Sequence, residues 1–411
     1  MTSLDLAFVR QQFPSLAGDW VFMDNAGGAQ VPKPVVDRLQ QYLLTSNVQH
    51  GASYEVSKLA GDRVAAATQA MADFMGAASA SEVVLGASTT LMLRILAWCL
   101  VQTWQPGDEV IVTNCDHEAN IGAWTQLERF GIVIKFWRIR PDTLELDLAD
   151  LDALCTPRTR LVAVTHVSNV LGTVNPIGAI AQRVHQHNAL ICVDGVAYAP
   201  HRLIDVQAFD VDFYVLSLYK VFAPHQSLLY GKRDLLLALP GFNHYFISDA
   251  TLPYKFQPGN VNFELTYSLL GLQDYFSKLA HAHFADQTAP DWRGQLQQAF
   301  SLITEHEQAL GDRLLSYLAT KSTVRVLGIP TPNSSQRIPT ISFVVEERHS
   351  QDIPTHVDTH QIAIRWGDFY AKRMIEDLGL AEQGGVVRVS LVHYNTLEEV
   401  DRLIQALDEV L

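Results

Sequence analysis

The most informative part of this sequence for its architecture is ALICVDGVAYAPHRLIDVQAFDVDFYVLSLYK, residues 189–220. It contains two short and largely apolar runs, ALICVDG and VDFYVLS, and each run stops at polar residues. Runs of this kind are typical of strands that are buried on both faces of a sheet. Asp194 ends the first run, and Ser217, Tyr219 and Lys220 follow in or after the second. Because ligands bind at the C-terminal ends of the strands in parallel sheets, we expect a binding site there.

The same alternation extends across residues 80–235. Four more apolar runs precede the two above, namely EVVLGAS, DEVIVTN, IVIKFW and TRLVAVTHV. Amphipathic stretches such as TTLMLRILAWCLVQTW and NPIGAIAQRVHQHN separate most of these runs. Strands that alternate with helices predict an α/β domain in which helices cover both faces of a mostly parallel sheet.

The remainder of the chain, from about residue 266, has a different pattern. A long helical region leads to a smaller α+β unit with expected strands in RIPTISFVVEE, QIAIRW and VVRVSLV. Thr396 and Glu399 have the spacing of a capping box that begins a last helix. We therefore expect a large domain over residues 20–265 and a small domain over residues 266–411, which also includes residues 1–19.

Composition excludes several classes of protein. The chain has 411 residues, of which 48% are hydrophobic and 18% charged, so it is an ordinary globular protein with room for two or three domains. A net charge of −14 without a basic run argues against nucleic acid or anionic membranes as partners. No signal peptide or long apolar segment is recognisable, and the four cysteines form no CxxC pair. We expect a cytoplasmic protein with reduced thiols.

Three features at the predicted strand ends suggest chemistry, and each also has a simpler explanation. Thr89 and Thr90 begin a predicted helix, where hydroxyl and backbone N–H groups either bind a phosphate or only cap the helix. Lys220 follows an apolar strand, so its amine is either a desolvated nucleophile or extends to water. The Asp194 carboxylate either pairs with a ring nitrogen or caps a helix. Together, a phosphate site, an acid, an amine and a ring platform at His117 favour pyridoxal phosphate over a nucleotide.

The order of motifs along the chain resembles one enzyme family from about residue 20 to the C-terminus. The matching stretches are MDNAGGAQVPKPV, GASTT, DHEANIGAW, THVSNVLGTVNPIG, VDGVAYAPH, LSLYK, PGNVNFE and VRVSLVHYNTLEEVD. They resemble the class V aminotransferases and cysteine desulfurase-like (selenocysteine lyase-like) proteins. That resemblance implies the fold-type I architecture of pyridoxal-phosphate enzymes, with a mostly parallel, seven-stranded-type sheet between helices and a smaller C-terminal α+β domain. It also implies pyridoxal phosphate as cofactor and a homodimer with shared active sites.

The resemblance assigns a role to each matching residue. Lys220 would form the Schiff base with the cofactor and move the α-proton, while Asp194 would pair with the pyridine nitrogen and His117 would stack on the ring. Arg388 would bind the carboxylate of an amino-acid substrate. The other cofactor contacts would come from Thr89, Thr90, Asn169, Ser217, Tyr219 and, across the subunit interface, Asn260. Further substrate contacts are expected from Ala26, Gly27, His50, Tyr54 and Tyr370, and His201 and Arg365 are either structural or pocket residues.

Departures from the family pattern bear on the reaction. Tyr219 replaces the usual phosphate-binding histidine, and Ala197 stands where a glutamine is common. Tyr370 aligns with the cysteine that takes up sulfur in desulfurases, and no cysteine follows Cys192. Since the thiolate is the nucleophile in that reaction, desulfuration is not expected. Cys115 is a substitute thiol only if it is not a buried core residue.

We therefore expect a carbon–sulfur lyase that carries out β-elimination on cysteine or a cysteine derivative. In that reaction Tyr370 would serve as an acid near the leaving group, unless it is only a packing residue. The alternatives are a class V aminotransferase, a desulfurase-like enzyme that needs no cysteine, a racemase, a decarboxylating biosynthetic enzyme, and a non-catalytic regulatory protein on the same fold. No spaced set of His, Cys and carboxylate residues in the sequence suggests a metal site.

Overall fold

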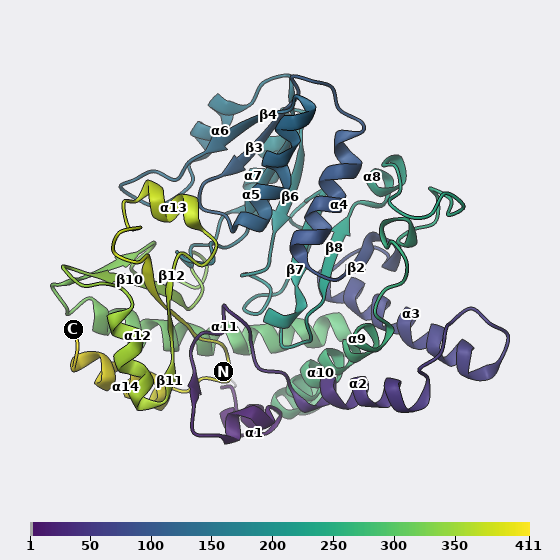
Figure 1. Ribbon diagram of the computed structural model, residues 1–411. Coiled ribbons are helices and arrows are strands. Elements are labelled where there is room, and N and C mark those ends of the chain that lie inside the picture. Colours follow the sequence, from purple (N-terminus) through teal and green to yellow (C-terminus); the bar gives the residue numbers. More distant parts are fainter. Residues whose placement is uncertain (1–2) are drawn as a thin grey trace.

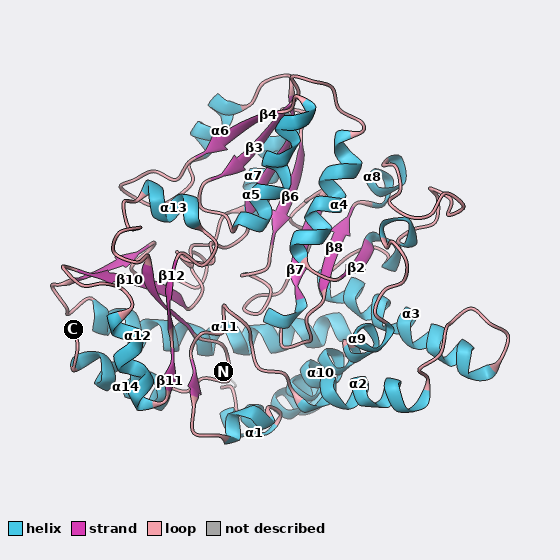
Figure 2. Cartoon of the chain, viewed as in Figure 1, coloured by secondary structure: helices cyan, strands magenta, loops and turns pink. Residues whose placement is uncertain are grey.

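The computed structural model describes residues 3–411 and consists of a large α/β domain beside a smaller α+β domain (Figures 1 and 2). The large domain is built on a seven-stranded sheet. Its strands, in spatial order, are β2 (Val83–Gly86), β8 (Ser227–Gly231), β7 (Phe213–Ser217), β6 (Leu190–Asp194), β5 (Thr159–Thr165), β3 (Glu109–Thr113) and β4 (Val133–Trp137). Only β8 runs antiparallel to its neighbours. The prediction of a mostly parallel sheet is confirmed, and the strand that the sequence analysis missed is β8.

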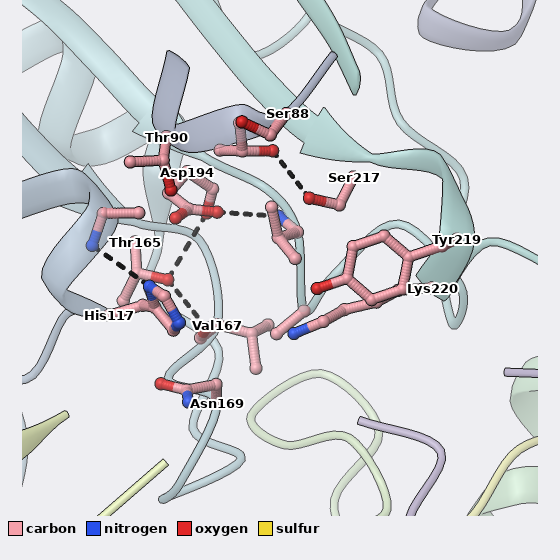
Figure 3. Close-up of a pocket in the computed structure, with 14 residues that line it drawn as sticks. Ser88, Thr90, His117, Thr165, Val167, Asn169, Asp194, Ser217, Tyr219 and Lys220 are labelled. Atoms are coloured by element: carbon pink, nitrogen blue, oxygen red, sulfur yellow. Dashed lines mark hydrogen bonds between the residues drawn. The ribbon is translucent and has the colours of Figure 1, made fainter. Parts of the chain in front are cut away.

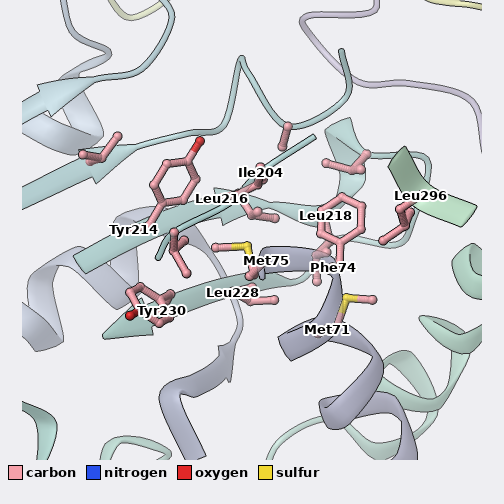
Figure 4. Close-up of a cluster of buried hydrophobic side chains, with 14 of the residues drawn as sticks. Met71, Phe74, Met75, Ile204, Tyr214, Leu216, Leu218, Leu228, Tyr230 and Leu296 are labelled. Carbon is pink, nitrogen blue, oxygen red and sulfur yellow. The ribbon is translucent and has the colours of Figure 1, made fainter. Parts of the chain in front are cut away.

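Helices cover both faces of this sheet, and the alternation of side chains along the strands shows why. In β7, Tyr214 and Leu216 pack on one face, while Phe213 and Val215 pack on the other. The covering helices are α3 (Glu55–Met75), α4 (Thr89–Val101), α5 (Glu118–Thr125), α6 (Leu148–Leu154), α7 (Ile177–Gln186), α8 (Arg233–Ala238), α10 (Leu270–Phe284) and α11 (Trp292–Leu318). Figure 4 shows Met71, Phe74 and Met75 of α3 packed against β7 and β8. Strands buried on both faces have no polar face, which explains their nearly continuous apolar runs.

The small domain contains a four-stranded antiparallel sheet. Its strands, in spatial order, are β12 (Arg365–Gly367), β13 (Val386–Ser390), β10 (Thr340–Val345) and β9 (Val324–Leu327). The helices of this domain are α12 (Asp352–Val357), α13 (Lys372–Asp377) and α14 (Leu397–Asp408). Thr396 and Glu399 form the expected capping box at the start of α14. The strands expected in RIPTISFVVEE and VVRVSLV are confirmed as β10 and β13. The strand expected in QIAIRW is divided into β11 (Ile362–Ala363) and β12, which belong to different sheets, and β9 is additional.

The two domains are connected by packing as well as by the chain. Helix α11 is 27 residues long; Leu296 and Phe300 lie in the core of the large domain, whereas Leu310 and Leu314 lie in that of the small domain. The N-terminal segment adds α1 (Leu6–Gln11) and β1 (Val21–Phe22), and β1 pairs with β11 (Ile362–Ala363). Helices α2 (Lys33–Thr45) and α9 (Phe263–Ser268) pack beside α10 (Figure 1). The exact domain boundary at residue 265 stays a prediction.

Gly172 lies at a close backbone contact between the two domains. It has a positive φ of 69°, and a side chain there would overlap the backbone oxygen of Thr340 in β10. Only glycine combines this conformation with that contact. The loop that follows β5 is therefore held directly against the small sheet. Within residues 3–411, no helix is both long and apolar enough to cross a membrane.

We predict that Leu216→Ala destabilises the protein by about 2–5 kcal/mol, because truncating a fully buried leucine loses apolar contacts and leaves a cavity. Leu216 is 0% exposed and lies in β7, the strand that leads to Lys220. Urea denaturation followed by circular dichroism measures this change. Leu397→Ala is the matched control, because Leu397 of α14 is 41% exposed and its truncation should cost less than about 0.5 kcal/mol. Equal losses in the two variants would contradict the assignment of β7 to the core.

Candidate active site

Two adjoining cavities lie at the C-terminal edge of the large sheet, where the small domain covers it. The inner cavity is the more enclosed of the two, and the outer cavity opens to solvent. Both cavities are lined by His117, Asn169, Tyr219 and Lys220. In Figure 3, Lys220 and Tyr219 face His117 and Asn169 across the inner cavity, and Ser88, Thr90 and Ser217 line a third side.

The third side of the inner cavity is a cluster of hydroxyl groups at the N-terminus of α4. The Thr89 hydroxyl lies 2.7 Å from that of Ser217 and 3.0 Å from that of Ser227. Ser88 caps the helix by accepting a hydrogen bond from the Leu91 N–H. A helix N-terminus presents free N–H groups and the positive end of the helix dipole, so this corner suits a phosphate group. Ser227 is a member of this cluster that the sequence analysis missed.

Asp194 ends β6 and is 4% exposed at the floor of the inner cavity. One of its carboxylate oxygens accepts a hydrogen bond of 2.9 Å from the Val196 N–H. Burial raises the pKa of Asp194 to about 6, while this N–H and Lys220 oppose the rise, so the carboxylate is mostly ionised at neutral pH. It is therefore suited to pair with a protonated ring nitrogen.

The backbone beside Asp194 is fixed by a buried aromatic layer. A side chain on Gly195 would overlap the ring of Tyr214, whose hydroxyl lies 2.9 Å from Nδ1 of His166. The His166 ring in turn stacks on Tyr198, with ring centroids 3.6 Å apart. Glycine at position 195 is thus required by close packing, and this aromatic layer packs against the backbone that carries the Asp194 carboxylate.

His117 forms the opposite wall and is the N-cap residue of α5. Its Nδ1 accepts a hydrogen bond of 3.1 Å from the Ala119 N–H, so a neutral ring carries its proton on Nε2. The pKa of His117 is lowered to about 4, mainly by burial and to a smaller extent by the positive charges of Lys220 and Arg388. The imidazole is consequently neutral and presents a flat face to the cavity.

Lys220 lies on a short turn after β7 and is 8% exposed. Burial lowers its pKa to about 8, and the neighbouring Arg388 lowers it too, while Asp194 and Asp24 act in the opposite direction. A substantial fraction of the amine is therefore unprotonated at slightly alkaline pH, which a lysine nucleophile requires. This environment favours the interpretation of Lys220 as a desolvated amine.

Arg388 lies in the middle of β13 and is 2% exposed. It is directly opposite Arg365 of β12, an arrangement that is unfavourable for two like charges. Asp24 compensates for both charges, since one of its oxygens lies 2.9 Å from Nη2 of Arg388 and the other lies 3.4 Å from Nη1 of Arg365. The Nε of Arg388 has no hydrogen-bond partner in the described part of the chain. Arg388 therefore retains a donor for a substrate carboxylate.

The loop that carries Tyr370 has a strained backbone. Phe369 and Tyr370 have positive φ values of 51° and 60°, which are uncommon for aromatic residues. The backbone oxygen of Phe369 accepts a hydrogen bond of 2.9 Å from the Asn169 side-chain amide, and the backbone oxygen of Tyr370 accepts one of 2.7 Å from the Glu118 N–H. The Phe369 ring lies 3.7 Å from the guanidinium carbon of Arg388. These contacts hold the loop in one conformation despite its strain.

Tyr370 itself stands at the mouth of the outer cavity. Its ring stacks on His117 with centroids 5.2 Å apart, and its side chain is 70% exposed. The sequence analysis identified Tyr370 and Arg388 but missed Asp24 and Phe369. Asp24 lies in the quoted stretch MDNAGGAQVPKPV, and Phe369 directly precedes Tyr370. Only the bridge between Asp24 and Ser390 and the pairing of β12 with β13 bring these residues to the arginine.

Most of the predicted site residues are brought together. Ala26 and Gly27 line the outer cavity with Arg365, and Thr90 lines the inner one. Four predicted residues lie outside both cavities of their own chain. Asn260 and His50 line separate surface grooves, Tyr54 is 51% exposed, and His201 is buried 3.0 Å from Glu307. His201 is therefore structural.

The four cysteines lie away from the cavities. In residues 3–411, none of them lines either cavity. Cys115 is buried, and burial raises the pKa of its thiol to about 12, with a further contribution from Asp116. A neutral, enclosed thiol is a poor nucleophile, so Cys115 belongs to the core.

Comparisons with known proteins agree with this geometry. The sequence model of the family described as aminotransferase class-V matches residues 21–403. An aminotransferase-like protein of Gibberella zeae is 43% identical over 421 residues, which cover 100% of this chain and 99% of the relative. A cysteine desulfurase-like protein of Aspergillus flavus is 34% identical over 99% of this chain and 91% of its own length. A cysteine desulfurase structure from Escherichia coli superposes with a TM-score of 0.83, at 26% identity and over 98% of each chain. The expected fold-type I architecture is confirmed.

The residues present fit pyridoxal phosphate, the cofactor of these families. The hydroxyl cluster at α4 suits its phosphate, and Asp194 suits its ring nitrogen. Oδ1 of Asn169 is buried and has no hydrogen-bond partner within residues 3–411, so it is an acceptor that awaits a donor such as a ring hydroxyl. Lys220 supplies an amine for the aldehyde.

We predict that the Lys220 amine titrates near pH 8 and that Arg388→Gln raises its pKa, because a neighbouring cation is removed. Asp24→Asn should lower it, because that carboxylate stabilises the ammonium. Competitive acetylation of cofactor-free protein at a series of pH values, read by peptide mass spectrometry, measures both shifts. The exposed Lys58 in the same digest is the internal control. Unchanged titration midpoints of Lys220 in both variants would refute the proposed influence of Arg388 and Asp24 on its pKa.

Proposed function

The chain belongs to the aminotransferase class-V family of pyridoxal-phosphate enzymes, and on that premise we propose that it is a carbon–sulfur lyase acting on cysteine or a cysteine derivative. For cysteine, the net reaction converts the amino acid and water to pyruvate, ammonia and hydrogen sulfide. The observation that carries this proposal is the combination of a complete amino-acid site with a tyrosine, in place of a thiol, on the loop at its mouth.

The cofactor would be held by residues of the inner cavity. Thr89 and Ser217 would bind the phosphate, Asp194 the ring nitrogen and Asn169 the ring hydroxyl, and His117 would cover one face of the ring. Bound pyridoxal phosphate supplies an electron sink for bonds that break at the α-carbon of an amino acid. Asp194 would maintain that sink by keeping the ring nitrogen protonated.

The chain's own residues would then divide the proton transfers. The free Nε of Arg388 and its Nη groups would orient the substrate carboxylate in the outer cavity. The amine of Lys220, with its lowered pKa, would take the α-proton. Tyr370 lines the outer cavity opposite Lys220 and would donate its phenolic proton to the departing sulfur.

Sulfur transfer to the protein is disfavoured by the state of the thiols. A desulfurase mechanism requires a thiolate within reach of the substrate sulfur. Burial raises the pKa of Cys99 and Cys115 to about 12 and that of Cys155 to about 11, and it raises the pKa of Cys192 well above its usual value. All four thiols are therefore protonated at neutral pH.

Transamination is the second candidate, and the 43% identical relative, whose name describes it as aminotransferase-like, favours it. In that reaction the amino group would pass to the cofactor and then to a keto acid. Lys220 would serve both reactions as the proton carrier, so the products distinguish the two candidates. No sulfide would be released from cysteine by transamination.

We further propose that the enzyme is a homodimer whose two active sites are shared. Asn260 and His50 lie in surface grooves outside the catalytic cavities of their own chain. Beside them, α2 and α3 expose Leu44, Tyr54 and Val56. An exposed apolar surface next to polar residues of this kind is typical of subunit interfaces. In a dimer, Asn260 of one subunit would reach the phosphate site of the other.

We predict that the enzyme loaded with pyridoxal phosphate converts L-cysteine to pyruvate and sulfide in equal amounts, without alanine. Tyr370→Phe should lower kcat by about 10²–10⁴-fold, because it removes a general acid, while KM changes little. Coupled pyruvate assays with sulfide detection measure the reaction. Tyr370→Phe keeps the aromatic stacking on His117, so a loss of packing does not explain the result.

Lys220→Ala is the inactive control for the lyase assay. Alanine and a protein persulfide would refute the lyase proposal in favour of desulfuration. Keto-acid-dependent turnover without sulfide would favour transamination instead. Full activity of Tyr370→Phe would be compatible with the lyase proposal but would show that Tyr370 is not the general acid.

For the shared sites, we predict that hybrids of Lys220→Ala and Asn260→Ala chains regain activity that neither parent has. In such a hybrid, one site carries both substitutions and the other carries none. Light scattering after size-exclusion chromatography establishes the dimer, and the lyase assay follows the mixed chains after subunit exchange. A monomeric wild type, or a hybrid no more active than its parents, would contradict a shared site.

A further inference from the structure

Three potential metal ligands gather on the surface of the small domain, apart from both cavities. They are His356, His360 and Glu409. Nε2 of His356 lies 3.0 Å from Oε2 of Glu409, and Nε2 of His360 lies 3.4 Å from the same oxygen. The ligand atoms of all three side chains lie within 4.8 Å of one another. The two histidines and the glutamate therefore converge on one point.

The fold determines this convergence. His356 is in the last turn of α12, and His360 ends the short helical turn after it, so the i, i+4 spacing places both rings on one side. The backbone oxygen of His360 accepts a hydrogen bond of 3.4 Å from Arg402 of α14. Glu409 follows the last residue of α14, and α12 packs on that helix through Ile353, which is buried. All three ligands are thus attached to elements that are packed together.

The identity and spacing of these groups fit a transition metal ion. Two imidazole nitrogens and one carboxylate oxygen are the protein ligands of several zinc sites, with bonds of about 2.0–2.2 Å to tetrahedrally placed ligands. Ligand atoms at such distances are about 3.3 Å apart, and the two nitrogen–oxygen separations here are 3.0 and 3.4 Å. A simple ion pair needs only one histidine for the carboxylate. Here, two imidazoles direct the same ring nitrogen, Nε2, toward one carboxylate oxygen.

We propose that His356, His360 and Glu409 bind one zinc ion, or a divalent cation of the same class. Water would complete the coordination, because the side chains are between 32% and 53% exposed and the outer side of the cluster is open. The ion would connect α12 and its following turn to the C-terminal end of α14. It would stabilise the domain that carries Arg388 and Tyr370 without touching the catalytic cavities, so this site is independent of the proposed reaction.

The test compares the wild-type holoenzyme with the double variant His356→Gln/His360→Gln and with His244→Gln as the matched control. His244 is an exposed histidine in a loop, away from the three ligands. After treatment with a chelator, each protein is dialysed against zinc, and bound metal is measured by mass spectrometry. The wild type and the control should each retain one equivalent more than the double variant. Zinc should also raise their melting temperature more than that of the double variant.

Cobalt provides a second measurement that does not depend on the double variant being folded. Co²⁺ in a site with two nitrogen ligands and one oxygen ligand has a visible absorption band. Zinc should abolish this band in the wild type by displacing Co²⁺. The substitution Glu409→Gln should weaken it. Equal zinc stoichiometry and equal thermal shifts in the wild type and the double variant would overturn the proposal. So would the absence of a Co²⁺ band in the wild type, which would leave the three residues as a hydrogen-bonded surface cluster.

Discussion

Two buried cations share one cavity in this protein, and much of the site is arranged around that constraint. Lys220 and Arg388 are 8% and 2% exposed, and Arg388 makes the charged state of Lys220 less favourable. Asp194 compensates on the large-domain side, and Asp24 compensates on the small-domain side. Because burying a charge without a partner costs several kcal/mol, each carboxylate offsets part of the cost of burying the cation beside it. The balance leaves the lysine easier to deprotonate, while the arginine is held in place.

This charge balance exists only because two domains meet at the cavity. Lys220 and Asp194 are at the ends of β7 and β6, whereas Arg388 is in the small sheet and Asp24 follows the N-terminal strand β1. The contact of Gly172 with β10 and the continuous helix α11 fix the position of the two sheets relative to each other. A hydrogen bond of 3.2 Å crosses the same boundary, from the Arg388 guanidinium to the backbone oxygen of Asn169. The packing between the domains therefore determines the geometry of the site.

The sequence predicted the parts of the structure that depend on local patterns. Six strands of the large sheet are visible as apolar runs that stop at polar residues, and Asp194, Ser217 and Lys220 mark those stops. Strand β8 was missed because it returns directly after the Lys220 turn without a helix between them. Asp24 and Phe369 were missed for a different reason, since their contacts with Arg388 span 364 and 19 positions of the chain. Nothing in their own neighbourhood indicates a partner at that distance.

The proposed metal ligands and the active-site loop illustrate the same limit of prediction from sequence. The sequence analysis expected no metal site, although His356 and His360 stand four residues apart. The third proposed ligand, Glu409, is 53 positions from His356 and becomes a neighbour only when α14 packs on α12. At the active site, the sequence shows that Tyr370 stands where desulfurases have a cysteine, but it does not show which residues surround Tyr370. The strained backbone that presents Tyr370 also places Phe369 on Arg388, so one loop contacts both His117 and Arg388 at the outer cavity. If the proposed function is correct, a tyrosine in place of the thiol would therefore alter a unit of two aromatic residues beside the substrate, rather than a single nucleophile.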